Sequence, residues 1–198
     1  MATNPPAALG NGYGALQDGP LADYGALREV MVDLVPLVLG ADAAALAASE
    51  TAGDFFRNVG TNQHFIDGEA TVNETEASVG WITTLLPATY VAGKPLAIAA
   101  TAGIVLAGDA ALTSATIDFE VYKQAADGTV GSDLVETAAT AITTTFGTKT
   151  FVITPTGLAA GDRLVIKMTT SVVETAGGTG AANSRITSLT LNGDIEEN

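Results

Sequence analysis

Turn signals recur at short, regular intervals through the last three-quarters of this chain, and they limit its fold more than any other feature. From about residue 53 onward, stretches rich in Thr, Val and Ile alternate with the segments AGKP, AGDAAL, DGTVGSD, TTFGTK, TGLAAGD and GGTGAAN. A spacing of roughly 8–12 residues between turns is typical of antiparallel sandwiches and barrels. No stretch in this region has a convincing helical period, so the pattern predicts an all-β domain.

The candidate strands between these turns are short and many of them alternate in polarity. They cover residues 54–59, 63–72, 77–86, 95–106, 115–124, 133–143, 146–154, 162–171 and 184–193. The clearest is ATIDFEVYK, in which Ile117, Phe119 and Val121 share one face and polar side chains occupy the other. We therefore expect an antiparallel, jelly-roll-like β-sandwich over residues 53–198.

Two of these strands carry further information. The segment SVGWITTLLP places Val79, Trp81 and Leu85 on one face, and a lone Trp in such an apolar strand is more often core than binding surface. In SRITSLTLN the apolar phase changes between Ile186 and Leu189, which predicts a β-bulge at this point.

The residues before the sandwich divide into two segments. Residues 1–22 are rich in Pro, Gly, Ala and Asn and cannot bury enough apolar surface to offset the entropy of ordering, which predicts a flexible arm. Residues 23–52 form a linker with one helical stripe, consisting of Leu27, Val30, Met31, Leu34 and Val35. The same Val-rich stretch also fits an extended arm that pairs with another chain. A short helix and an extended segment therefore both stay open.

The charge of the chain excludes several classes of partner. The net charge is −14, and the eight Lys and Arg residues are scattered singly. Nucleic-acid binding needs a clustered positive surface, and an anionic membrane repels a surface of this kind. The longest apolar stretches, 30–48 and 95–112, are interrupted by Asp, Pro or Gly. The sequence predicts neither a nucleic-acid partner nor a membrane association.

Groups with catalytic chemistry are few. His64 is the only imidazole, and the sequence shows neither an orienting partner nor a nucleophile elbow for it. The segment IDGEATVNETE gathers the carboxylates Asp67, Glu69, Glu74 and Glu76. A carboxylate pair can hydrolyse a glycoside across a cleft, but acids that alternate along one strand are more often a solvated edge. We expect no enzymatic activity and no cofactor.

Metal binding and sugar binding each have weak candidates. Asp127 and Asp133 lie close together in AADGTVGSD, but their spacing departs from a calcium-binding loop and Asp-Gly is ordinary hairpin chemistry. Because the chain has no cysteine, it has no thiolate metal site, and we expect no bound metal. The aromatic residues Trp81, Tyr90 and Tyr122 are candidate stacking surfaces for a glycan.

Three stretches taken together resemble structural proteins of tailed-phage particles. They are WITTLLPATYVAGKPLAI (81–98), IDFEVYKQAADGTVGSDLVETAATAI (117–142) and FVITPTGLAAGDRLVIKMTT (151–170), followed by ANSRITSLTLNGDIEE. The likeness is to jelly-roll head-decoration proteins, also called cement proteins, and covers about residues 77–195.

This resemblance implies a non-enzymatic virion protein on the capsid surface. Such a protein binds the major capsid protein, decorates and stabilises the head lattice, and commonly forms a homotrimer. The N-terminal segment would then dock on the capsid through the candidate anchors Leu9, Tyr13, Leu16, Tyr24, Leu27 and Met31. An arm that folds on docking spreads its contacts over a wide surface, and a repeating lattice adds avidity. The alternative is a phage fibre adhesin or a carbohydrate-binding β-sandwich module.

Overall fold

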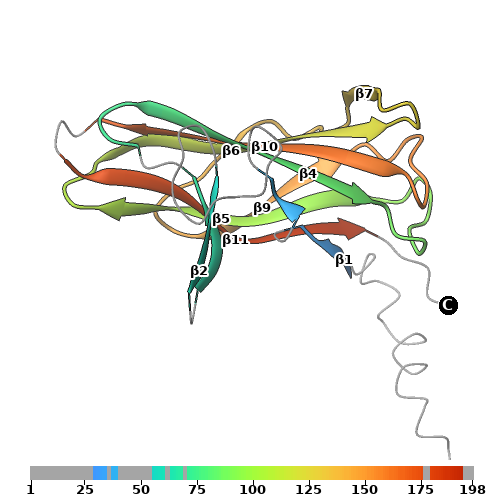
Figure 1. Cartoon of the computed structure of the whole chain (residues 1–198), viewed down its shortest axis with the longest axis horizontal. Coiled ribbons are helices and arrows are strands. Elements are labelled where there is room, and N and C mark those ends of the chain that lie inside the picture. Colours follow the sequence, from blue (N-terminus) through green and yellow to red (C-terminus); the bar gives the residue numbers. More distant parts are fainter. Residues whose placement is uncertain are drawn as a thin grey trace, which may run out of the picture.

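The fold is described from a computed structural model, which covers residues 29–34, 37–39, 55–60, 63–68, 71–175 and 179–193. Strands account for the regular structure of these residues, and no α-helix occurs among them (Figure 1). The all-β class predicted from the turn spacing is therefore confirmed. A search of the same residues for an apolar helix of membrane-spanning length finds none.

The described residues contain eleven strands. They are β1 (Glu29–Asp33), β2 (Phe56–Gly60), β3 (Gln63–Asp67), β4 (Thr75–Leu85), β5 (Leu96–Ala107), β6 (Leu112–Gln124), β7 (Val130–Asp133), β8 (Thr140–Ala141), β9 (Gly147–Ile153), β10 (Arg163–Glu174) and β11 (Ala181–Gly193).

The strands form two antiparallel sheets that pack face to face. Sheet I has the order β2-β3-β11-β5-β9, and β1 also pairs with β11; sheet II has the order β4-β10-β6-β7, and β8 also pairs with β6. From β3 to β6, and again from β9 to β11, successive strands lie in opposite sheets. This repeated crossing is the arrangement of a jelly roll, and it confirms the predicted sandwich (Figure 1).

The core lies between the sheets and is built largely by alternation of side chains along the strands. Strand β10 buries Leu164, Ile166 and Met168 and turns the intervening residues outward. Ile117, Phe119 and Val121 of β6 are buried as predicted. Phe119 meets Phe151 of sheet I edge to face, with 4.8 Å between ring centroids. Full burial of one such side chain contributes roughly 1.5–3 kcal/mol.

Strand β4 corrects one expectation about the core. Val79, Trp81 and Leu85 share a face as predicted, but this is the outer face, and the interleaved Ile82 points into the core. The inward position between them is Gly80, where a Cβ would lie 3.0 Å from the Phe55 ring and 3.1 Å from Val38. The large side chains that fill this space thus come from distant segments, which the local pattern of β4 does not reveal.

Two irregularities set the shape of the later strands. The register of β11 against β5 shifts between Ile186 and Ser188, which confirms the predicted bulge. The strand expected over 133–143 is wrong for most of these residues, because β7 ends at Asp133 and only Thr140–Ala141 form the next strand, β8. Asp133 is the physical reason, because its Oδ1 accepts the N–H groups of Val121 at 2.8 Å and Val135 at 3.0 Å, and the chain turns there.

The N-terminal segment enters the sandwich through β1, which pairs antiparallel with the end of β11. Residues 29–33 are thus extended, which is one of the two alternatives left open, although they pair with β11 of the same chain and not with another chain. The helical alternative is wrong for these residues. The backbone of β11 explains this outcome: β3 occupies only part of that edge and leaves groups that β1 can pair with. Residues 1–28 lie outside the described part, with the anchors Leu9, Tyr13, Leu16, Tyr24 and Leu27. Met31 is placed by its backbone alone.

Candidate functional site: the outer face of sheet II

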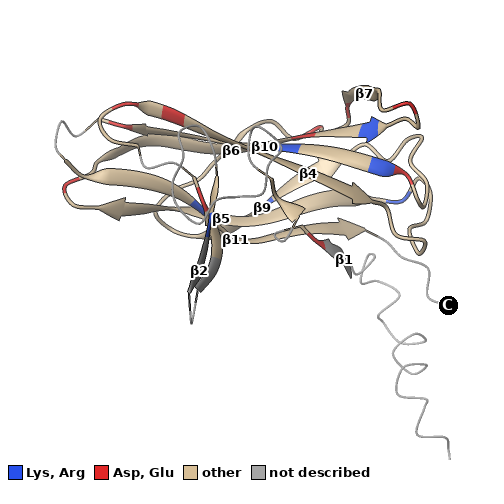
Figure 2. Cartoon of the chain, viewed as in Figure 1, with Lys and Arg blue, Asp and Glu red and all other residues tan. Residues whose placement is uncertain are grey.

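The outer face of sheet II carries three rows of side chains that run across β4, β10 and β6. The strand registers define these rows as Leu85–Arg163–Gln124, Thr83–Val165–Tyr122 and Trp81–Lys167–Glu120. We call these nine residues the sheet II face. Because residues two apart along a strand are separated by roughly 7 Å, the first and third rows lie about 14 Å apart. Figure 2 shows basic residues on β6 and β10 in this region.

The third row is held by an ion pair and a short hydrogen bond. Lys167 Nζ lies 2.9 Å from Glu120 Oε1, and the Tyr122 hydroxyl donates to Glu120 Oε2. The hydrogen bonds from Tyr122 and Lys167 lower the pKa of Glu120, although burial opposes them. The same bond to Glu120 raises the pKa of Tyr122 to about 12. At neutral pH the row therefore holds an ionised carboxylate between an ammonium and a protonated phenol.

Two aromatic side chains lie near the Lys167–Glu120 pair, Trp81 in the third row and Tyr122 in the second. Trp81 on β4 and Tyr122 on β6 are both partly exposed, and β10 lies between their strands. Two strand spacings and one row separate their backbones by about 12 Å. Trp81 exchanges two backbone hydrogen bonds with Leu39, at 2.7 and 2.9 Å, which fix the outer edge of β4. The expectation that Trp81 is a core residue is wrong, because the pleat of β4 turns it outward.

Tyr90, the third aromatic candidate, belongs to the core. Its side chain is buried, and its hydroxyl donates to the carbonyl oxygen of Lys94 at 3.0 Å. It closes the connection between β4 and β5 and offers no face to a ligand. The prediction of a stacking surface is therefore wrong for Tyr90.

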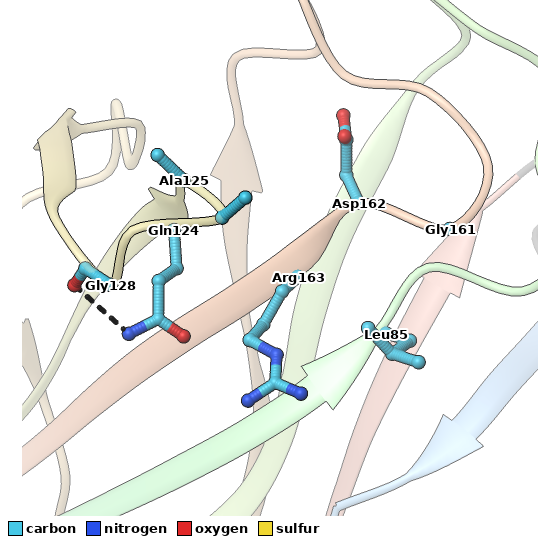
Figure 3. A pocket seen from close by; sticks show the side chains of 8 residues that line it. Leu85, Gln124, Ala125, Gly128, Gly161, Asp162 and Arg163 are labelled. Atoms are coloured by element: carbon cyan, nitrogen blue, oxygen red, sulfur yellow. Dashed lines mark hydrogen bonds between the residues drawn. The ribbon is translucent and has the colours of Figure 1, made fainter.

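A groove of about 580 Å³ opens at the first row (Figure 3). Its lining residues are Leu85, Gln124, Ala125, Ala126, Gly128, Gly161, Asp162 and Arg163. Two turns form its walls, one between β6 and β7 and one between β9 and β10. Gly128 has a φ of 90° and Gly161 a φ of 82°, a left-handed conformation that strongly favours glycine. These turns were visible in the sequence as DGTVGSD and TGLAAGD.

The charges beside the groove are partly neutralised. Lys123 Nζ lies 2.7 Å from Asp162 Oδ2 and also donates to the carbonyl of Gly157 at 2.9 Å. Burial raises the pKa of Asp162, but the hydrogen bonds from Lys123 and the Ala159 amide outweigh it and hold that pKa below its usual value. Asp162 is therefore ionised, and its carboxylate already accepts hydrogen bonds from Lys123 and the Ala159 N–H.

Of the carboxylates considered for hydrolysis, Asp67 has a structural role. Asp67 accepts two hydrogen bonds from Arg185, at 2.7 Å from Nε and 2.8 Å from Nη2. The Arg185 guanidinium also stacks 3.6 Å from the centroid of the Phe65 ring. Glu74 is exposed in the connection before β4, and Glu76 lies at the start of that strand. Glu69 and the side chain of His64 lie outside the described residues.

The two aspartates considered for calcium act as turn caps. Asp127 Oδ1 accepts from the N–H and the hydroxyl of Thr129, at 3.0 and 2.7 Å, and these bonds lower its pKa. Asp133 accepts the two N–H groups that break the strand after β7. Within the described part of the chain, His, Cys, Asp and Glu side chains form no group of three suited to a metal.

Sequence reasoning found Trp81 and Tyr122 but missed Arg163, Lys167, Glu120 and Gln124. Glu120 and Lys167 are 47 residues apart in the sequence, so their pairing depends on the register between β6 and β10. Alternation within each strand placed these residues on the polar side. It carried no signal about which strands are neighbours.

Comparison with known proteins shows a likeness of architecture only. No protein-family model matches the sequence, and no curated protein matches it. Among solved structures, the chain is similar to TmCBM61 in complex with β-1,4-galactotriose, at 15% identity and a TM-score of 0.36 over 68% of this chain and 73% of that one. It is also similar to the CBM22-1 xylan-binding domain from Paenibacillus barcinonensis Xyn10C, at 16% identity and a TM-score of 0.35 over 75% and 100%. A CBM4 structure matches at 13% identity and a TM-score of 0.35 over 80% and 94%. Scores this low leave the ligands of those proteins without bearing on the site described above.

Proposed function

We propose that this protein is a non-catalytic binding module whose sheet II face binds a saccharide chain. The observation that carries the proposal is the placement of Trp81 and Tyr122 on one outward face, with the Lys167–Glu120 pair beside them. A pyranose presents an apolar C–H face and a rim of hydroxyls, so it needs flat aromatic surface beside oriented polar groups. Ligand sites commonly combine apolar or aromatic surface with a few placed polar groups in this way.

The rigidity of the face favours binding. Both polar partners in the third row project from paired strands of an antiparallel sheet, and each is already held by a hydrogen bond. A ligand that exchanges hydrogen bonds with Lys167 and Glu120 would meet side chains whose rotamers are already restricted. Such preorganisation lowers the entropic cost of association.

A glycan array followed by calorimetry tests this proposal. The Trp81→Ala and Tyr122→Ala variants should each weaken binding about tenfold, the equivalent of 1.4 kcal/mol, because each removes a stacking surface. Phe146→Ala is the matched control, since Phe146 is an exposed aromatic that covers Gly103 on sheet I. Unchanged affinity in both sheet II variants, or no glycan bound by the wild type, would contradict the proposal.

Decoration of a phage head is a second candidate function, favoured by the position of β1. In this proposal the protein sits on the virion surface as a homotrimer and binds the major capsid protein through its N-terminal segment. Strand β1 fixes the point at which that segment joins the edge of sheet I. Any anchor before residue 29 would thus act from a constant position on the sandwich.

Truncation tests the decoration proposal. Removal of residues 1–28 keeps β1 but deletes the anchors Leu9, Tyr13, Leu16, Tyr24 and Leu27. The truncated protein should keep its β-rich circular dichroism spectrum and lose co-sedimentation with capsids assembled from the major capsid protein. Normal co-sedimentation of the truncated protein would refute the role of these anchors.

A further inference from the structure

One side chain that lines the groove at the first row, Arg163, is positively charged and forms no ion pair with a described residue. Lys123 pairs with Asp162, Lys167 with Glu120, and Arg185 with Asp67. Figure 3 shows the side chain of Arg163 extending between Gln124 and Leu85, while Asp162 points away from it. The guanidinium fork is thus open to a ligand.

The neighbours of Arg163 complement a sugar that carries a negative charge. Gln124 donates its Nε2 to the carbonyl of Gly128 at 3.2 Å, which orients the amide and leaves its Oε1 as an acceptor. Leu85, which is 53% exposed, supplies an apolar wall on the other side. The first row therefore offers a charged fork, a hydroxyl acceptor and an apolar surface next to one another.

The balance of charge in the groove favours a ligand with a single negative charge. Lys123 and Asp162 compensate one another, so Arg163 supplies one net positive charge. The chain as a whole carries −14, and a small free anion would gain little at such a site against that field. An anionic group attached to a saccharide has the further contacts of the sheet II face. A planar carboxylate also matches the guanidinium fork in two parallel hydrogen bonds.

We propose that the groove binds the carboxylate of a uronic acid residue within the saccharide that lies along the sheet II face. This inference rests on the proposed saccharide-binding function and adds the class of sugar. Arg163 would hold the carboxylate, Gln124 Oε1 would accept a hydroxyl, and Leu85 would contact the ring. Because the first and third rows are about 14 Å apart, the same chain would reach Trp81 through further sugar units.

Calorimetry with matched oligosaccharides tests this inference. The probes are an oligogalactoside that contains a single galacturonic acid residue, the methyl ester of that acid and the neutral oligogalactoside of the same length. The wild-type protein should bind the free acid about tenfold more tightly than either neutral probe, which corresponds to one charge-assisted contact of roughly 1.4 kcal/mol. Arg163→Gln should abolish that preference, so that the acid and the neutral probes bind with equal affinity. Arg163→Lys should recover part of it, since it keeps the charge but loses the fork.

Lys149→Gln is the matched control, because it removes the same charge from β9 of sheet I. It should leave the preference intact. Equal affinity for the acid and the neutral probes, with binding still dependent on Trp81, would overturn the uronate assignment and support the proposed function. If binding of the acid depends on Arg163 but not on Trp81 or Tyr122, the proposed function of the sheet II face is overturned, and the groove remains a carboxylate-binding site. A stronger response to a sulfated oligogalactoside than to the acid would also overturn the uronate assignment.

Discussion

The two sheets present outer faces of the same geometry and opposite chemistry. On sheet I, the registers of β9, β5 and β11 define the rows Val152–Ala97–Asn192, Thr150–Ala99–Thr190 and Thr148–Thr101–Ser188. These rows carry small or uncharged side chains, whereas the sheet II face carries Arg163, Lys167, Glu120 and two aromatics. The comparison shows that packing of the sandwich requires apolar side chains at the inward positions, whereas the outward positions are free to differ in chemistry between the two sheets. Among the rows compared, those of the sheet II face combine charged groups with aromatic surface.

The largest effect on the free energy of unfolding is expected from a substitution in the core that both sheets share. Phe151→Ala removes the sheet I partner of Phe119 from a fully buried position and should cost about 3–5 kcal/mol. The free energy of unfolding from urea denaturation checks this value. A loss below 1 kcal/mol would mean that the inward positions do not hold the two faces together.

The next largest effect is expected for the ion pairs of the two sheets, which should contribute different amounts to the free energy of unfolding. Arg185→Met leaves the Asp67 carboxylate, which is only 4% exposed, without its partner and should destabilise the protein by about 3 kcal/mol. Lys167→Met breaks a pair whose side chains are 29% and 33% exposed and should cost less than about 1 kcal/mol. Denaturation of the two variants side by side is the measurement. Equal losses would show that the sheet II pair also has a structural role.

The phenol of Tyr122 should titrate apart from an ordinary tyrosine. Its pKa is raised from 10.0 to about 12, so its contribution to stability is fully present below pH 10 and is lost as the pH rises through 12. The absorbance change of phenol ionisation, followed with rising pH, should show one tyrosine that ionises near pH 12. Glu120→Gln should lower the pKa of Tyr122 towards its usual value, because the carboxylate that accepts its hydrogen bond is removed. A wild-type phase with an ordinary pKa would mean that the hydrogen bond to Glu120 does not persist in solution.

The smallest effect is expected on the sheet I face. Thr150 is exposed and opposite Ala99, so Thr150→Lys should change the free energy of unfolding by no more than about 0.5 kcal/mol. Saccharide affinity should also be unchanged in calorimetry. Altered glycan binding in this variant would place recognition on both faces and remove the contrast between them.

Much of the fold could be predicted because it depends on local patterns. Alternation placed Ile117, Phe119 and Val121 in the core, and the phase change before Leu189 located the bulge. The prediction failed where two faces of a strand were both partly apolar. In β4, Trp81 is larger than the inward Gly80, and only the packing of Phe55 and Val38 over that glycine decides which side is buried.

The sequence by itself determined the strand class, the turns and the apolar face of the clearest strands, because period-two alternation and glycine stereochemistry act within a few residues. The tertiary structure alone decided that Trp81, Lys167 and Glu120 share a row and that Arg163 stands between Leu85 and Gln124. It also decided that residues 29–33 extend along β11 rather than coil. These outcomes depend on register between strands far apart in the chain, and a shift of one residue would turn each of these side chains to the opposite face.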